Sequence, residues 1–338
     1  MKRSSACCAS AATGKRSSRT SKVGNLKARA RRGVLIGWAL TSMSVLARHL
    51  SLRTVRALGT FFGELTWRII WRHRKRALSN IAIAFPDWPE KKRRETARKM
   101  FHNVGQSLIE WMWLPNLDPR LLAETTEIHD AHYIDEALAG GRGAIIFTAH
   151  FGNWEWLAAT VTLLGHPLTV LQRDRDEPDL NRFIMRMRSH FNMRSIGRKS
   201  ESSALEMYRA LRHGELLAFL IDQTIRAESV KVPFFGRPAL TPIGPARLAV
   251  RAEAPVMICF IERRDDKQIV HFQKPFTSSD PYEITVRLTA AIEEQVRRAP
   301  EQWIWLHNRW KDRPRWDRTA QFTRAAAYGA DAGRTEAR

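Results

Sequence analysis

The sequence predicts an α/β fold in which a mixed sheet is flanked by helices on both faces. Short apolar runs of strand length recur between residues 144 and 272, and segments with apolar residues at helical spacing separate them. Alternating strands and helices are typical of a sheet whose two faces are both buried. The 338 residues, of which 44% are hydrophobic, supply enough apolar material for a sizeable core.

The composition excludes several classes of protein. Lys and Arg total 56 against 34 Asp and Glu, and the formal net charge of +22 indicates a negatively charged partner. Three cysteines exclude a disulfide-stapled scaffold, and Cys259, which lies in an apolar run, is expected to be a core residue. No run reaches the ~20 apolar residues of a spanning helix, which excludes a polytopic membrane protein.

The N-terminal region predicts contact with a membrane. Residues 1–32 carry ten Lys or Arg and no Asp or Glu, and we expect a basic disordered tail there. Residues 33–47 are uncharged, and residues 48–76 place apolar side chains at helical spacing among arginines, which suits an anionic membrane surface. We expect membrane-anchoring or amphipathic helices over residues 33–76. The apolar run either crosses the bilayer or lies in its interface, and the alternative is an ordinary surface helix.

The main domain is expected over residues 77–316. Residues 77–140 have helical periodicity, broken by Pro86 and Pro89, and glycines then bound the first apolar run, as they do at buried strands. From the break onward the expected elements are helix 90–114, strand 144–149, helix 154–164, strand 167–171, helix 179–190, helix 202–212, strand 216–221, helix 243–253, strand 256–261, strand 268–272 and helix 282–298. The last two strands are expected to pair as a hairpin, and the polar residues 317–338 to form a loose tail.

The first predicted strand is followed by His150-Phe151-Gly152-Asn153-Trp154-Glu155. In an open α/β sheet, ligands bind beyond the carboxyl ends of the strands. Asn153 is expected to cap the next helix, which places Glu155 in its first turn. A carboxylate there fixes the tautomer of an imidazole and stabilises the imidazolium. His150 is therefore a candidate general base, with Glu155 as its partner.

Two further clusters hold polar candidates. Asp222 and Gln223 end an apolar strand, and Asp222 is either a second active-site acid or a cap for the next turn. His307 and Arg309 follow two tryptophans that are expected to pack in the core, and both are candidates for contact with an anionic ligand.

An aromatic segment forms the last cluster. Phe234, Phe235 and Gly236, followed by Thr241 and a proline-initiated helix, are expected to form a loop. The loop either lines an apolar pocket beside an anion-binding helix N-terminus or is a structural loop packed on the core.

Together these blocks resemble the lauroyl and myristoyl acyltransferases of lipid A biosynthesis, a family of lysophospholipid-type acyltransferases. The resemblance covers roughly residues 35–315. The segment from His150 to Glu155 matches the family's His-x4-Asp/Glu motif in its Glu form. The later blocks follow in the family's order: Asp222-Gln223, Val232-Pro233-Phe234-Phe235-Gly236, Thr241-Pro242 and Pro300-Glu301-Gln302-Trp303. The resemblance implies a glycerolipid-acyltransferase-like fold behind an N-terminal membrane anchor.

The resemblance also implies an activity. The family transfers a fatty acyl chain from acyl carrier protein to a hydroxyl of a lipid A precursor, at the cytoplasmic face of the bacterial inner membrane. His150 would deprotonate the hydroxyl, and Glu155 and Asp222 would be the two acids of the site. The family's oxyanion-stabilising arginine lies some thirty residues after the motif, which suggests Arg186 or Arg188.

The remaining candidates are implied to bind substrate: Arg173, which is also possible as the oxyanion donor, Gln223, Phe234, Phe235, Gly236, Thr241, His307 and Arg309. No covalent enzyme intermediate, metal, nucleotide or other cofactor is required. Asn308 stands where a basic residue is common in the family. The motifs do not separate a lipid A precursor from other acceptors such as phosphatidylinositol mannosides or lipoamino acids.

The implied partners explain the charge, because acyl carrier protein is acidic and the lipid A precursor carries phosphates. Nucleic acid is not an expected partner, since the basic residues form no groove-reading or stacking motif and an apolar anchor has no use there. The absence of a Gly-x-Ser-x-Gly elbow disfavours a serine esterase. The intact His150 and Glu155 disfavour an inactive scaffold on the same fold.

Overall fold

The computed structural model describes residues 37–172, 178–197, 202–319 and 321–322. A helical segment at residues 37–48 precedes three helices, α2 (Leu52–Ile69), α3 (Trp71–Ala84) and α4 (Glu90–Trp113). The strands are β1 (Thr126–His129), β2 (Ala144–Thr148), β3 (Leu168–Gln172), β4 (Arg194–Gly197), β5 (Leu216–Leu220), β6 (Ser229–Phe234), β7 (Arg237–Pro242), β8 (Val256–Arg264) and β9 (Lys267–Phe272). The other α-helices are α5 (Pro119–Thr125), α6 (His132–Leu138), α7 (Trp154–Leu163), α8 (Pro178–Ser189), α9 (Ser203–Arg212), α10 (Gly244–Ala252) and α11 (Pro281–Arg298).

The described strands form a mixed seven-stranded sheet of order β1-β9-β8-β2-β5-β3-β4 and a separate two-stranded sheet, β6-β7. The central strands β8, β2, β5, β3 and β4 run parallel. The predicted hairpin is confirmed, because β8 and β9 pair antiparallel, and β1 then adds parallel to β9. The sequence therefore predicted the mixed α/β class correctly.

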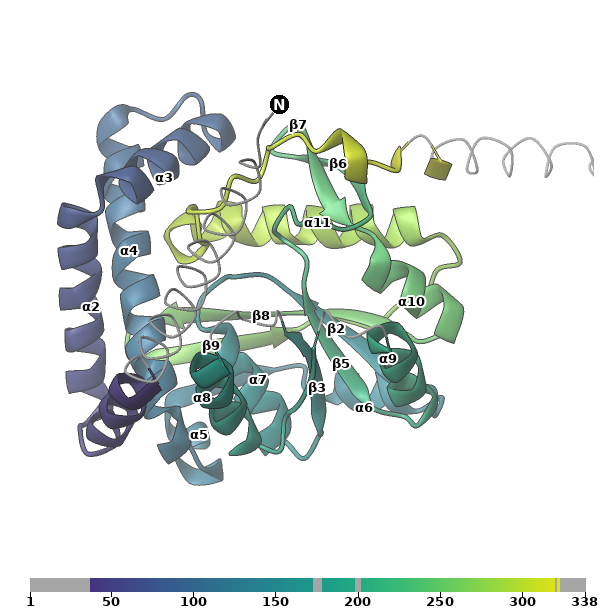
Figure 1. Cartoon of the computed structure of the whole chain (residues 1–338), viewed down its shortest axis with the longest axis horizontal. Helices are drawn as coiled ribbons and strands as arrows, with labels where there is room; N and C mark the ends of the chain where they lie inside the picture. The colour runs from purple at the N-terminus through teal and green to yellow at the C-terminus, as the bar shows by residue number, and fades with distance from the viewer. Residues whose placement is uncertain (1–36, 173–177, 198–201, 320, 323–338) are drawn as a thin grey trace, which may run out of the picture.

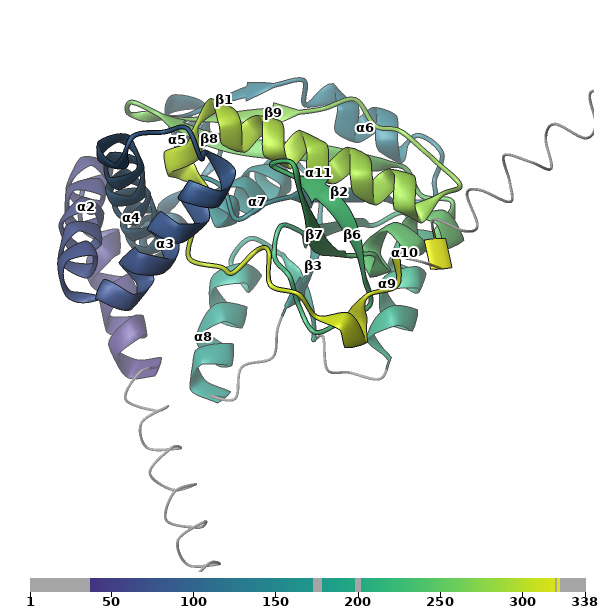
Figure 2. The same cartoon turned by 90° about the horizontal axis from the view of Figure 1, so that it is seen from above.

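Helices cover both faces of the sheet. Alternate side chains of β2 point to opposite faces, and each set packs into a different core. Ile145 and Phe147 join a core with α3, α4, α9, α10 and α11, whereas Ala144 and Ile146 join a second core with residues of α4 to α7. In Figures 1 and 2, α11 lies across one face of the sheet, and α2 and α4 lie side by side at one end of it.

Two parts of the predicted pattern are wrong. The short strands β1 and β4 were not predicted, because each has four residues and only part of each is buried. The expected aromatic loop at residues 232–241 is the hairpin β6-β7 instead. Its turn residues, Phe235 and Gly236, have φ of 52° and 69°, the positive values that a two-residue type I′ turn requires.

Glycines let α2 and α4 pack closely. A Cβ on Gly105 would lie 2.2 Å from the carbonyl oxygen of Gly59 and 2.9 Å from the backbone nitrogen of Gly63. The two backbones therefore approach each other where no other side chain fits.

We expect Gly105→Ala to lower the free energy of unfolding by about 1–3 kcal/mol, because a methyl group there must push the two helices apart. Thermal unfolding followed by circular dichroism measures this as a Tm lowered by several degrees. Gly140→Ala is the matched control, since nothing lies within 4 Å of a Cβ at that position. Equal Tm values for the two variants would contradict the close packing.

The N-terminal and C-terminal regions of the chain were expected to form a membrane anchor and loose tails. Within the described ranges, no helix is long and apolar enough to cross a membrane. The basic tail expected at residues 1–32 lies outside the described residues. At the other end, Arg318 donates its backbone N–H to the carbonyl of Ser229, and Lys231 donates to the hydroxyl of Thr319, so residues 317–319 attach to β6.

Candidate active site

The turn after β2 positions His150 at the carboxyl edge of the sheet. Gly152 has φ of 56°, and a Cβ there would lie 2.2 Å from the carbonyl oxygen of Ile261, so only glycine fits. Asn153 caps α7 as predicted, because its side-chain oxygen accepts from the N–H of Trp156 at 3.1 Å. The His150 carbonyl in turn accepts from the N–H of Ile304.

The carboxylate that holds His150 is Asp222. The His150 Nδ1 lies 2.8 Å from Asp222 Oδ1, and the His150 backbone N–H donates to Oδ2 at 3.1 Å. The indole N–H of Trp303 also donates to Oδ2, at 2.9 Å. The side chain of Asp222 is only 1% exposed, whereas that of His150 is 25% exposed. The pair therefore has a buried acid and an imidazole within reach of solvent.

This arrangement fixes the protonation states. Burial alone would raise the pKa of Asp222, but the charge of His150 and the three hydrogen bonds lower the pKa below its ordinary value of 3.8. An ionised carboxylate only accepts hydrogen bonds, so Nδ1 of His150 must carry a proton and donate it. The Nε2 lone pair is then the basic position of the neutral ring.

Glu155, the expected partner of His150, pairs instead with Arg188. The Arg188 guanidinium donates to the two Glu155 oxygens at 2.7 and 3.3 Å, and both side chains are mostly buried. The structure gives no hydrogen bond between Glu155 and His150 among the interactions of its described residues. In the described structure Asp222, and not Glu155, is therefore the carboxylate that contacts His150. The two residues meet because β2 and β5 are neighbouring parallel strands.

The three arginine candidates are now distinguished by position. Arg188 lies at the end of α8, where Glu155 brings its guanidinium to the first turn of α7. Arg186, two residues earlier on α8, is exposed. Arg173 lies outside the described residues.

His307 is close enough to the His150 and Asp222 pair to interact with it electrostatically. Its Nε2 accepts the backbone N–H of Thr224 at 3.0 Å, which leaves the ring proton on Nδ1. Burial lowers the pKa of His307, and the positive charge of Arg309 lowers it further although Asp222 raises it. The structure thus holds a neutral donor beside the catalytic candidates. Gln223 follows Asp222 and is half-buried.

Arg309 and Thr241, expected to bind substrate, are buried inside the protein. The Arg309 guanidinium donates to the carbonyl of Leu240 at 2.6 Å and to the hydroxyl of Thr241 at 2.5 Å. It also lies over the ring of Phe234, with its central carbon 5.1 Å from the ring centroid. Burial lowers its pKa to about 10, so it stays charged at neutral pH. These contacts hold the end of β7, which leads into α10.

Phe234 and Phe235 are also core residues, and Gly236 completes the hairpin turn. Phe234 packs against the rings of Trp303 and Trp310, and Phe235 against Trp305. Both phenylalanines are at most 6% exposed. Of the two alternatives that the sequence left open for this segment, the structure therefore supports packing on the core. Phe234 and Phe235 expose too little surface to line a pocket.

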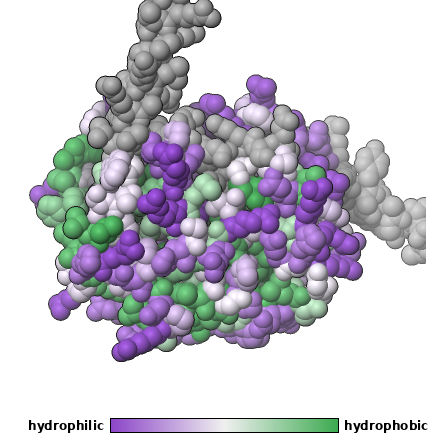
Figure 3. Space-filling view, turned by 60° about the horizontal axis from the view of Figure 1, so that its bottom comes forward, coloured by the Kyte–Doolittle hydropathy of each residue, from purple (hydrophilic) through white to green (hydrophobic). Residues whose placement is uncertain are grey.

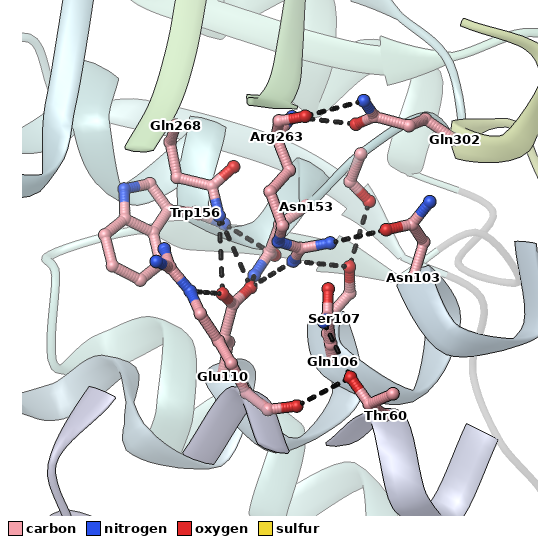
Figure 4. A network of polar contacts seen from close by, with 12 residues as sticks. Thr60, Asn103, Gln106, Ser107, Glu110, Asn153, Trp156, Arg263, Gln268 and Gln302 are labelled. Atoms are coloured by element: carbon pink, nitrogen blue, oxygen red, sulfur yellow. Dashed lines mark hydrogen bonds and ion pairs between the residues drawn. The ribbon is translucent and has the colours of Figure 1, made fainter. Parts of the chain in front are cut away.

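A buried polar network beneath the His150 turn was not predicted from the sequence. Glu110 of α4 is fully buried, and its carboxylate accepts from Arg56 at 2.7 Å, from Arg263 at 2.5 Å and from Asn153 at 2.9 Å. Figure 4 shows Asn153, Arg263 and Gln268 converging on Glu110. The partners lie far apart in the sequence, so no local pattern indicates the network.

The described residues contain no group of three His, Cys, Asp or Glu side chains arranged to hold a metal ion. The chemistry that the visible site supports is general-base catalysis. A hydroxyl near Nε2 of His150 can lose its proton to the ring, and Asp222 then stabilises the imidazolium.

Comparison with known proteins identifies the family. The sequence model described as "Bacterial lipid A biosynthesis acyltransferase" matches residues 25–312. The chain is 30% identical over 270 residues to the lipid A biosynthesis lauroyltransferase of Escherichia coli K12, which covers 76% of this chain and 85% of that protein. It is 25% identical over 267 residues to the E. coli lipid A biosynthesis palmitoleoyltransferase, with the same two coverages.

A relative with another acceptor is similar over a shorter stretch. The phosphatidylinositol mannoside acyltransferase of Mycobacterium tuberculosis is 29% identical over 217 residues, 62% of this chain and 68% of that protein. The family match spans most of the chain and contains the whole site around His150. The chain therefore belongs to the family of bacterial lipid A biosynthesis acyltransferases and is an acyltransferase.

Proposed function

We propose that this acyltransferase moves a fatty acyl chain from acyl carrier protein to a hydroxyl of a lipid A precursor. The observation that carries the proposal is the pair of His150 and buried Asp222 at the carboxyl edge of the sheet, in a chain of this family. The relatives named for lipid A biosynthesis support the acceptor class.

The proposed reaction proceeds by direct attack. Nε2 of His150 takes the proton of the acceptor hydroxyl as its oxygen attacks the thioester carbonyl, and Asp222 stabilises the imidazolium that forms. The tetrahedral intermediate collapses to the ester, and the sulfur leaves with the proton returned from Nε2. A thioester is already an activated acyl group, so this scheme uses no metal, nucleotide or covalent enzyme intermediate.

We assign stabilisation of the oxyanion to Arg188. Its guanidinium is mostly buried and is oriented by Glu155, which follows His150 by five residues in the same turn and helix. A preoriented and mostly buried cation stabilises developing negative charge more strongly than an exposed one. Glu155 is then a positioning residue for the arginine.

An assay with several donors and acceptors tests the proposed function. Purified protein in detergent is supplied with acyl-carrier-protein thioesters of different chain lengths and with either lipid A precursor or a phosphatidylinositol mannoside. We expect ester formation on the lipid A precursor. Transfer to the mannoside alone would move the function to the second acceptor class that the mycobacterial relative represents. No transfer to either acceptor from any donor would contradict the proposal.

We further propose that the protein acts at the cytoplasmic face of the bacterial inner membrane, with α2 in contact with lipid. Phe61, Leu65 and Ile69 recur at every fourth position of α2 and are 40–66% exposed. Arg53 and Arg68 of the same helix are exposed. In Figure 3 hydrophobic residues gather along the left edge, on the side where α2 lies in Figure 1. An apolar face beside basic residues suits an anionic bilayer surface.

The triple variant Phe61→Ser, Leu65→Ser, Ile69→Ser is expected to bind anionic lipid vesicles on the order of 10- to 100-fold more weakly, because it removes most of the apolar area that enters the interface. Vesicle co-sedimentation measures the change. Leu205→Ser is the matched control, since Leu205 is an equally exposed apolar residue on α9. If the triple variant and the control bind equally well, α2 is not the lipid-binding face.

A further inference from the structure

We infer that Glu110 is a positioning residue for His150 and that it acts through the side-chain amide of Asn153. The inference rests on the proposed function, because it assigns Glu110 a role in the reaction that His150 is proposed to perform. Glu110 belongs to α4 and lies outside the motif that carries His150. Among the described residues, its direct hydrogen bond to that motif is the one from Asn153 to Glu110 Oε2, 2.9 Å long.

The geometry of the Asn153 side chain makes this bond directional. A carboxamide has one donor end and one acceptor end. The donor end of Asn153 is held by Glu110, so the acceptor end is turned to the N–H of Trp156, where it caps α7. Without a carboxylate at position 110, the amide loses the partner that selects this orientation. The start of α7, four residues after His150, is therefore set by Glu110.

Two other links join α4 to the same turn. Ser107, one helical turn before Glu110, donates its hydroxyl to the carbonyl of Gly152 at 3.1 Å. Arg263, which binds Glu110, also binds the side chain of Gln302 through its own backbone, and the Gln302 carbonyl accepts from the N–H of Gly152. Figure 4 shows Ser107, Glu110, Asn153 and Arg263 in one connected cluster. The turn that carries His150 is thus fixed from both sides by residues around Glu110.

The charges around Glu110 keep its carboxylate ionised, which is the form that accepts the hydrogen bond from Asn153. Burial alone raises the pKa of Glu110, but the charges of Arg263 and Arg56 and the hydrogen bonds lower it overall. The carboxylate is therefore ionised and acts only as an acceptor. Replacing buried ion pairs with apolar residues is often neutral or stabilising, so stability alone gives no reason for a charge here. The arrangement instead serves to define one orientation of the amide.

The test separates capping of the helix from the link to Glu110. Asn153→Ser keeps a good N-cap, but its shorter side chain cannot reach Glu110 while capping. Glu110→Gln places a group that can donate as well as accept at position 110, so it no longer selects one orientation of the Asn153 amide. The double variant combines the two changes. Asp118→Ser is the control, because Asp118 is a side-chain cap of α5 in the described structure and lies outside the site. Steady-state transfer gives kcat and KM, and thermal melts report folding.

A second readout does not depend on activity. The proton that His150 Nδ1 donates to Asp222 is expected to give a strongly downfield NMR signal in protein labelled with ¹⁵N-histidine, and His150→Gln identifies that signal by its loss. The signal reports whether the ring still faces Asp222.

We expect Asn153→Ser and Glu110→Gln each to lower kcat by on the order of 10- to 100-fold with unchanged KM, since a small misplacement of the base has effects of that size. The double variant is expected to lose no more than either single variant, and the downfield signal to weaken in all three. Asp118→Ser is expected to keep kcat and the signal.

The opposite results would overturn the inference. It fails if Asn153→Ser is folded and keeps both kcat and the downfield signal, or if the losses in the double variant multiply. Glu110→Gln has a buried charge imbalance that can prevent folding, and Asn153→Ser then decides alone. If the wild type transfers no acyl group, the proposed function fails, and the NMR signal still decides whether Glu110 positions the ring.

Discussion

Replacing His150 by glutamine is expected to lower kcat for acyl transfer by ~10²- to 10⁴-fold, the usual contribution of a general base. Glutamine can preserve the hydrogen bond to Asp222, but its amide cannot accept a proton from the acceptor hydroxyl at neutral pH. Neither substrate binds through the basic nitrogen alone, so both KM values should change little. Initial rates of ester formation with saturating donor and acceptor measure the effect.

His213→Gln provides the matched control for this variant. His213 is an exposed histidine at the end of α9, away from the carboxyl edge of the sheet that holds His150. Wild-type rates are expected for His213→Gln, and the melting temperatures of both variants should match the wild type. A folded His150→Gln protein that retains more than a tenth of the wild-type kcat would remove His150 from the role of base.

Asp222→Asn is expected to lower kcat by ~10³- to 10⁴-fold, as loss of the orienting carboxylate does in comparable His–Asp sites. The asparagine side chain has nearly the same shape, so the pocket around Trp303 is preserved. Its amide group, however, can donate to His150 Nδ1, which moves the ring proton to Nε2 and removes the base. Steady-state kinetics with the acceptor varied separates this loss of kcat from any change in KM.

The acid stability of the protein supplies an independent check on Asp222. Burial acts against the charged form, but His150 and the hydrogen bonds lower its folded-state pKa below 3.8. The stabilisation is therefore complete above the unfolded-state pKa and is lost as pH falls through the lower folded-state value. Urea unfolding between about pH 5 and pH 2 should show a smaller acid-induced loss in Asp222→Asn than in the wild type. A folded Asp222→Asn protein with more than a tenth of wild-type kcat would contradict the proposed partnership.

The main sheet was largely predictable because its central strands are continuous apolar runs. β2, β5 and β8 are buried on both faces, and a strand of this kind can be predicted from its own sequence without knowledge of its neighbours. β6 and β7 were not predicted as strands, because Pro233, Pro238 and Pro242 give their sequence the composition of a loop. Prolines are tolerated there because β6 and β7 pair with each other in a separate two-stranded sheet, so each strand has a neighbouring strand of that sheet on one side only.

The position of His150 was predictable from the residue pattern, but its pairing with Asp222 was not. His150 follows a legible strand, whereas local spacing favoured Glu155 as its partner. The register of β2 and β5 pairs Thr148 with Leu220, so His150 and Asp222 each lie two residues beyond a matched pair. That equivalence depends on which strands are neighbours. The residue pattern left strand order undetermined, so it allowed Asp222 to be either an active-site acid or a cap. The family resemblance implied an acid but gave no contact between Asp222 and His150.

Glu110 illustrates a further limit. In the sequence it is one charged residue on a helix of mixed character, a position usually exposed to solvent. Its burial follows from Arg56 and Arg263, which reach it from α2 and β8. Only the packing of those elements brings the three charges together.

A single-turnover experiment followed by intact mass spectrometry tests direct transfer by the His150 and Asp222 pair most sharply. Excess protein is mixed with acyl-acyl carrier protein, first without and then with the lipid A precursor, and both protein and lipid masses are recorded over time. We expect the protein mass to stay unchanged throughout and the precursor to gain one acyl group only in the wild type, not in His150→Gln. An acyl group found first on the protein, or equal product from His150→Gln, would contradict direct attack activated by His150.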